Sequence, residues 1–161
     1  MSNCTDDGPL TKNLQGYWQF DGNGSDASDN ARNLGLVGGI GFEEGLFGQA
    51  LSFNGDESRY AQRPIDDQVF DFGGSDFTVQ TWVNFNTTSG EQTLVEKWVD
   101  VGYFGWTLTK LPGDTLRFAF GGESTLTHHN SPFQPDSFIS LLFLEVERTS
   151  VCSSMGKWFG A

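Results

Sequence analysis

The chain has little positive charge, almost no cysteine and no long apolar run, and each shortage excludes a class of protein. Nine Lys and Arg residues stand against 21 Asp and Glu, a formal net charge of −12. This balance argues against nucleic acid, and against an anionic membrane surface, as a partner. Cys4 and Cys152 are the only cysteines, so no disulfide framework is expected. No apolar run approaches the roughly 18 residues of a membrane span, so we expect no membrane insertion.

The first residues, Met-Ser-Asn-Cys-Thr-Asp-Asp, contain no apolar region, and we expect no signal peptide in them. Residues 1–12 are polar and show no hydrophobic period. They are predicted to form a flexible lead-in.

What the chain does have is aromatic residues and glycine. Its 161 residues include 15 Phe and 21 Gly, with only 5 Pro. This length and an apolar content of 37 % are enough for one domain with a core. Many aromatics together with many glycines favour short strands and tight turns over helices. The composition therefore predicts an all-β fold.

The clearest predicted strand is residues 77–85, where apolar and polar side chains alternate. One face carries Phe77, Val79, Thr81, Val83 and Phe85 and is expected to point to the core. On the other face Trp82 is expected under a covering loop or against a partner sheet.

Other segments also read as strands joined by turns. Leu111-Pro-Gly-Asp114 is a turn signal that predicts a hairpin between residues 106–110 and 116–120. Asn54-Gly-Asp-Glu57 predicts a second hairpin, between residues 50–53 and 59–62. Short strands are also expected at residues 14–20, 34–37, 39–42 and 93–98. Residues 21–33, rich in Asp, Asn, Ser and Gly, are expected to form a loop. This spacing favours an all-β sandwich.

Three of these segments resemble, in order, the first half of a LamG-like, concanavalin A-type domain. They are Gly16-Tyr-Trp-Gln-Phe-Asp-Gly22, Phe47-Gly-Gln-Ala-Leu-Ser-Phe-Asn-Gly55 and Asp76-Phe-Thr-Val-Gln-Thr-Trp-Val-Asn-Phe85. The resemblance covers about residues 14–120. It implies an antiparallel jellyroll β-sandwich, here assigned to residues 13–130, of a kind common as a non-catalytic module of larger extracellular proteins. It does not specify a ligand, because a fold does not fix a function.

The chain departs from this family in two places. The family's first long loop often reads Asp-x-Ser-Gly-Asn-Gly, whereas here Asp29 and Ala31 stand at the two Gly positions. Such replacements are awkward wherever the backbone needs a positive φ. The family's later strands, including the one that closes the sandwich, are not legible after about residue 130. Residues 138–147 are apolar without alternation and are compatible with either strand or helix.

Residues 131–161 are therefore predicted to be an aberrant tail, and we hypothesise a frameshift beginning between residues 121 and 138. Codons compatible with residues 138–141, read two bases later, can encode His-Phe-Ala-Val, which is typical of a family strand. A sandwich that lacks its closing strands would expose apolar faces and unpaired edges, so instability or oligomerisation is expected. The nucleotide sequence tests the frameshift.

Two sites are predicted. The polar loop offers carboxylate and amide oxygens of the kind that Ca²⁺ prefers, and the resemblance implies a calcium ion held through Asp21, Asp26 and Asn30. The alternative is a loop capped by its own side chains. A second cluster, Trp98, Tyr103 and Trp106, could stack sugar rings as a glycan platform. Core packing is the commoner fate of such aromatics.

Catalysis is not expected. Glucanases of this fold carry two Glu on alternate residues around an Asp, and the only near match is Glu145-Val-Glu147, without that Asp. We expect a secreted or cell-surface recognition module that binds a glycan or an extracellular protein. The alternatives are a structural spacer or adhesion module that binds protein, and, less favoured, a fragment of a glycoside hydrolase.

Overall fold

The structure is a computed structural model. It describes residues 13–65, 68–72, 75–99, 104–113, 115–120, 125–129, 133 and 135–145. These residues are mostly β-strand and contain one short 3₁₀ helix, which confirms the all-β prediction. The elements are β1 (Gly35–Val37), β2 (Gly41–Glu44), β3 (Gln49–Ser52), β4 (Tyr60–Gln62), η1 (Gln68–Phe70), β5 (Phe77–Asn84), β6 (Gln92–Val99), β7 (Phe104–Leu111), β8 (Thr115–Phe120), β9 (Thr125–His129) and β10 (Phe138–Glu145).

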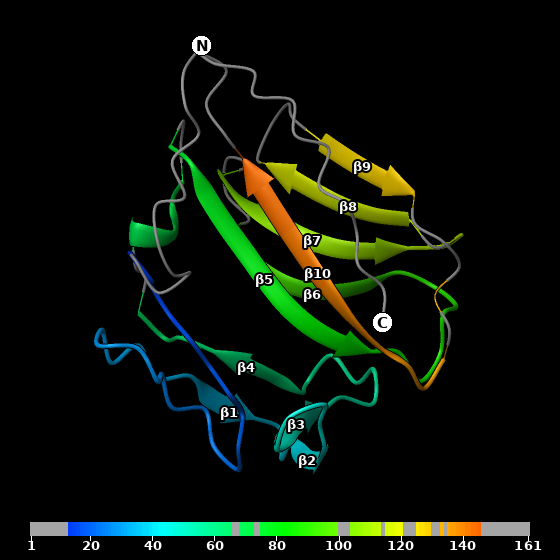
Figure 1. The fold of residues 1–161 in the computed structure, drawn as a ribbon, viewed down its shortest axis with the longest axis horizontal. Coiled ribbons are helices and arrows are strands. Elements are labelled where there is room, and N and C mark those ends of the chain that lie inside the picture. The colour runs from blue at the N-terminus through cyan, green and yellow to red at the C-terminus, as the bar shows by residue number, and fades with distance from the viewer. Residues whose placement is uncertain are drawn as a thin grey trace.

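The largest sheet is the antiparallel, four-stranded sheet β6-β7-β8-β9, which follows the order of the chain (Figure 1). The predicted hairpin between residues 106–110 and 116–120 is confirmed, since β7 pairs with β8 and Leu111 faces Thr115 at the turn. The Pro-Gly pair at 112–113 supplies its turn, with Gly113 at a φ of 77°. Strictly local connections therefore build this sheet.

A second layer is formed by β5 and β10, which cross in front of the four-stranded sheet (Figure 1). The alternation predicted for β5 is confirmed: Phe77, Val79 and Val83 are half-buried, whereas Gln80 and Trp82 are exposed. Residues 138–145, compatible with strand or helix on sequence alone, form a strand. They pair with the whole of β5, from Phe138 opposite Asn84 to Glu145 opposite Phe77. Part of the range 131–161 thus belongs to a sheet.

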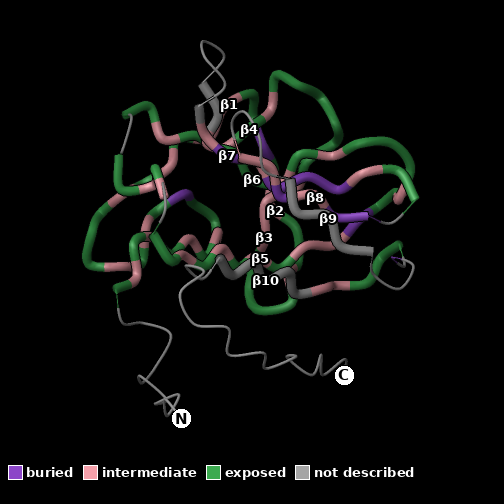
Figure 2. The backbone as a smooth tube through the Cα atoms, turned by 90° about the horizontal axis from the view of Figure 1, so that it is seen from above, coloured by how far each residue is buried: buried purple, intermediate pink, exposed green. Residues whose placement is uncertain are grey.

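The core lies between these two layers. Trp106, Leu108 and Phe118 of the four-stranded sheet are almost fully buried, and β5 packs on them through Phe77 and Val79. Toward the other end of β5, a second cluster combines Phe85, Leu116 and Phe133. The buried stretches in Figure 2 accordingly concentrate on β7 and β8. Aromatic side chains fill most of this space, in agreement with the Phe-rich composition.

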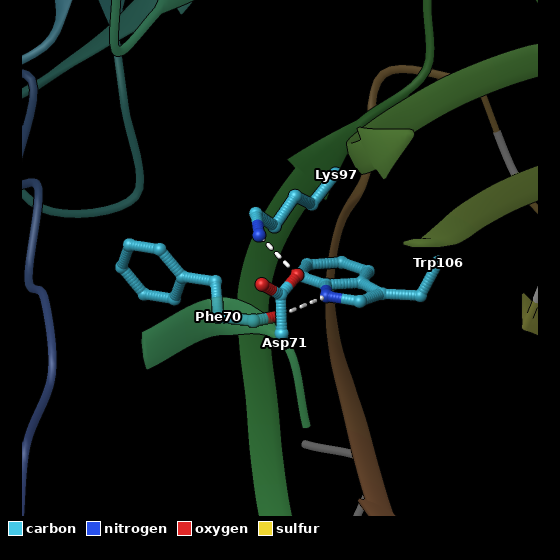
Figure 3. A network of polar contacts seen from close by, with 4 residues as sticks. All are labelled: Phe70, Asp71, Lys97 and Trp106. Atoms are coloured by element: carbon cyan, nitrogen blue, oxygen red, sulfur yellow. Dashed lines mark hydrogen bonds and ion pairs between the residues drawn. The ribbon is translucent and has the colours of Figure 1, made fainter. Parts of the chain in front are cut away.

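A short segment around η1 contacts β6 and β7 through polar groups (Figure 3). The indole N–H of Trp106 donates a hydrogen bond of 2.8 Å to the carbonyl oxygen of Phe70. Lys97 on β6 forms an ion pair with Asp71. Phe72 stacks on Trp106 with ring centroids 5.1 Å apart. Two polar contacts and one stacked ring therefore hold this segment against β6 and β7.

The N-terminal half forms two small sheets, β1-β4 and β2-β3, in place of the predicted hairpin between residues 50–53 and 59–62. That prediction is wrong, because β3 pairs with β2 and β4 pairs with β1, so that one pair is nested inside the other. The residues between β3 and β4 form side-chain-capped turns. Asn54 accepts from the N–H of Asp56, and Asp56 accepts from the N–H of Ser58.

The strand predicted at residues 14–20 is also absent from the described residues. In this segment the described residues form one isolated antiparallel bridge, between Trp18 and Asp26. Phe20 has a φ of 60°, which ends an extended run, and the N–H of Tyr17 donates to the side chain of Asp26. A side chain of the following loop thus takes a backbone donor that a strand would need. The predicted lead-in, residues 1–12, lies outside the described residues.

Candidate functional site

The loop of residues 21–33 is organised around the carboxylate of Asp26. Its Oδ1 accepts from the N–H groups of Tyr17 and Ser28, at 2.9 and 2.8 Å, and its Oδ2 accepts from the N–H of Arg32 at 2.8 Å. The N–H of Asp26 in turn donates to Oδ1 of Asn33. One side chain therefore satisfies three backbone donors that no strand pairs.

This arrangement fixes the charge of Asp26. Partial burial on its own would raise its pKa, but the three backbone N–H groups and the Ser28 hydroxyl outweigh burial. They lower the pKa of Asp26 from its ordinary value of 3.8 to about 2. Asp26 is thus an anion whose two oxygens are committed to the chain itself.

The other two predicted calcium ligands also bond to the backbone, at different places. Oδ1 of Asp21 accepts from the N–H of Gln49 at 2.6 Å, at the start of β3. Nδ2 of Asn30 donates to the carbonyl of Leu14 at 2.8 Å. Within the described residues, no three His, Cys, Asp or Glu side chains come together as a metal-binding group. Calcium binding through Asp21, Asp26 and Asn30 stays a prediction.

The predicted aromatic platform is described only in part. Tyr103 lies outside the described residues, and so does the side chain of Trp98, whose backbone belongs to β6. Trp106 is 6 % exposed, and its ring stacks on Phe118 at 5.5 Å and on Phe72. Trp106 therefore packs in the core and offers no open ring face.

A different pair of aromatic rings lies open on the surface. Phe47 is 76 % exposed and Trp82 is 48 % exposed. Their centroids are 6.2 Å apart and their planes meet at 81°, an edge-to-face contact. Phe47 stands on the turn between β2 and β3, and Trp82 on the face of β5 that points away from the core. We call Phe47 and Trp82 the aromatic pair.

Polar groups surround the turn that carries Phe47. Gly45 donates its N–H to the carbonyl of Gly48 at 2.9 Å and so closes this turn. Asp21 lies against it, because a Cβ built on Gly48 would come within 2.1 Å of Oδ1 of Asp21. Glu44 faces Gln49 across the hairpin and is exposed. Two carboxylates and an amide therefore border the turn.

The aromatic pair was missed by sequence reasoning. Phe47 begins one of the family-like segments, and Trp82 was expected under a loop or a sheet. A two-residue contact across 35 positions leaves no periodic signal, and exposure of a large aromatic depends on what packs over it. Asp21, by contrast, was singled out for its oxygens and does lie beside this turn.

No protein-family model, no curated protein and no solved structure matches the chain. The LamG-like resemblance thus rests on the three sequence segments alone. In the described part of the chain, no helix is long and apolar enough to cross a membrane.

Proposed function

We propose that the chain is a non-catalytic carbohydrate-recognition domain with a LamG-like jellyroll architecture. The proposed setting is secreted or cell-surface, within a larger protein. Two stacked antiparallel layers with a Phe-rich core support the architecture, and the three family-like segments support the setting. The observation that carries the binding function is the exposed aromatic pair.

The chemistry of the aromatic pair and its surroundings suits a sugar. A pyranose ring packs its C–H groups on an aromatic face and directs its hydroxyls to nearby amides and carboxylates. Phe47 and Trp82 provide two ring faces nearly at right angles. Asp21, Glu44 and Gln49 provide acceptors and an amide around the same turn. Single exposed aromatics are normal on a protein surface, whereas two in contact beside polar groups support the proposal of a binding surface.

Calcium is a separable part of the proposal. Because Asp26 already accepts three N–H groups, an ion would have to share or displace them. Titration calorimetry with Ca²⁺, with and without an Asp21→Asn change, tests the ion independently of sugar. A heat of binding that Asp21→Asn abolishes would support calcium, and no heat would remove it from the proposal.

A glycan array with labelled protein tests the binding function. We expect binding to a subset of neutral or cationic glycans, and loss of at least about tenfold in affinity for Phe47→Ala. Phe53→Ala is the matched control, because Phe53 is 48 % exposed and lies outside the aromatic pair. No reducing sugar should be released from any glycan that binds. Absence of binding, or an equal loss in both variants, would overturn the proposal.

A further inference from the structure

The charge around the aromatic pair narrows the kind of sugar that it can hold. Asp21 and Glu44 are exposed at the turn that carries Phe47. Within the described residues, no Lys or Arg forms an ion pair with either carboxylate, whereas Lys97 pairs with Asp71 and Arg117 with Glu91. Among the described residues, both anions therefore lack a cationic partner at the turn that carries Phe47.

From this arrangement we infer that the aromatic pair recognises a glycan bearing free amines, that is, a hexosamine whose nitrogen is not acetylated. This inference rests on the proposed function and adds the class of sugar. An ammonium group is attracted both to the carboxylates and to the electron-rich faces of Phe47 and Trp82. An anionic sugar would be repelled by the same carboxylates and by the formal net charge of −12.

The position of Asp21 makes this attraction specific. Its Oδ1 is held by the N–H of Gln49 at 2.6 Å, while Oδ2 has no hydrogen bond within the described residues. Gly48 leaves room for this carboxylate to lie against the turn, since a Cβ there would come within 2.1 Å of Oδ1. The carboxylate is thereby fixed one residue from Phe47. A fixed anion loses less side-chain entropy on binding than a freely rotating one.

Three hexamers that differ only at carbon 2 test the inference. They are the β-1,4-linked hexamers of glucose, N-acetylglucosamine and glucosamine. At about pH 5 most amines of the glucosamine hexamer are protonated, because a sugar amine is less basic than a lysine amine. Titration calorimetry should give an affinity about tenfold higher for the glucosamine hexamer than for either neutral one, because the contacts to Asp21 and Glu44 each contribute a factor of about three and the two factors multiply. The difference should shrink between about 0.02 and 0.2 M salt.

Variants separate specific recognition from general attraction to an acidic protein. Trp82→Ala should lower the affinity for the glucosamine hexamer by at least about tenfold. Asp21→Asn, whose Oδ1 can still accept from Gln49, should lower the preference for the amine several-fold. Asp29→Asn is the matched control, since Asp29 is an exposed carboxylate of the same loop, and it should leave the preference unchanged.

The outcomes are distinguishable. If no hexamer binds, and the array is also negative, the proposed function itself fails. If the neutral hexamers bind as tightly as the glucosamine hexamer, the function stands and the inference about the amine fails. Two results would show that the attraction to the amine is non-specific and would overturn the inference. One is full affinity for the glucosamine hexamer in Trp82→Ala. The other is an equal loss of preference for the amine in Asp29→Asn and Asp21→Asn.

Discussion

The indole N–H of Trp106 and the carbonyl oxygen of Phe70, 36 positions apart, form a hydrogen bond of 2.8 Å (Figure 3). Trp106 is almost fully buried, so few water molecules can reach its N–H as alternative partners. This bond joins the segment around η1 to the central strand β7.

Replacing the indole by a phenyl ring tests this bond. Trp106→Phe leaves the Phe70 carbonyl without its donor and leaves part of the ring volume empty. We expect the free energy of unfolding to fall by about 3 kcal/mol, to which an unsatisfied polar group contributes about 1–3 kcal/mol and the lost ring volume the remainder. Urea denaturation of the parent chain and the variant measures this difference in the free energy of unfolding. Trp82→Phe is the control, because that indole is 48 % exposed, and it should change the free energy by less than about 0.5 kcal/mol. Equal losses would refute the assigned role.

Acid should weaken the loop around Asp26. Its pKa is about 2 in the folded chain and near 3.8 when unfolded, so the folded state binds fewer protons between these values. The stabilisation from Asp26 is fully present above about pH 4 and is lost as the pH falls toward about 2. Urea midpoints measured across this window should fall less steeply for Asp26→Asn than for the parent chain. Asp29→Asn should follow the parent slope, and a steeper slope in Asp26→Asn would contradict the assignment.

Ala31 is predicted to be a strained residue that glycine would relieve. It has a φ of 52°, in the left-handed region, at a position where the LamG-like pattern has Gly. A non-glycine residue at such a φ costs about 1–2 kcal/mol of strain in the folded chain. Glycine removes this strain, but it also raises the conformational entropy of the unfolded chain, which offsets part of the gain. Ala31→Gly should therefore stabilise the chain by about 1 kcal/mol. Ala27→Gly, four residues earlier at a negative φ, should destabilise it by about 0.5 kcal/mol. A loss of stability in both variants would show that the loop does not strain Ala31.

Gly48 is expected to be needed for the contact between Asp21 and the β2–β3 turn. An alanine Cβ would come within 2.1 Å of Oδ1 of Asp21 and push that carboxylate off the N–H of Gln49. Gly55→Ala is the matched control, because Gly55 also has a positive φ but nothing lies within 4 Å of its built Cβ. Gly48→Ala should cost about 1 kcal/mol more than Gly55→Ala. The excess should disappear when Asp21 is already Ala; if it persists, another contact causes it.

Local patterns predicted the parts of the fold that local contacts build. The Pro-Gly turn after Leu111 predicted the β7–β8 hairpin, and the alternation from Phe77 predicted which face of β5 is buried. The nesting of β2–β3 between β1 and β4 was not predictable in this way, because either strand order satisfies the same two-residue period. The segment around Tyr17 was read as a strand because a single chain segment does not reveal that Asp26 will take its N–H.

The candidate site, too, could be predicted from the sequence only where local sequence features were sufficient. Asp21 could be chosen from its residue type and its loop, since carboxylates in polar loops bind ligands and ions. Phe47 and Trp82 could not be paired from sequence, because their contact joins the β2–β3 turn to the outer face of β5. Trp106 was chosen for its aromatic ring, and only the packing of Phe72 and Phe118 against it showed that the ring is enclosed.

The pairing of β5 with β10 has a consequence for how the chain folds. All of β6, β7, β8 and β9 lies between these two strands in the chain, so they meet only after a long loop has closed. The β7–β8 hairpin needs no such closure and can form early. We therefore expect β10 to join β5 late, and until then the edge of β5 that β10 pairs with is open to a neighbouring chain. On this expected order of events, newly made chains stay vulnerable to aggregation until β10 has paired with β5.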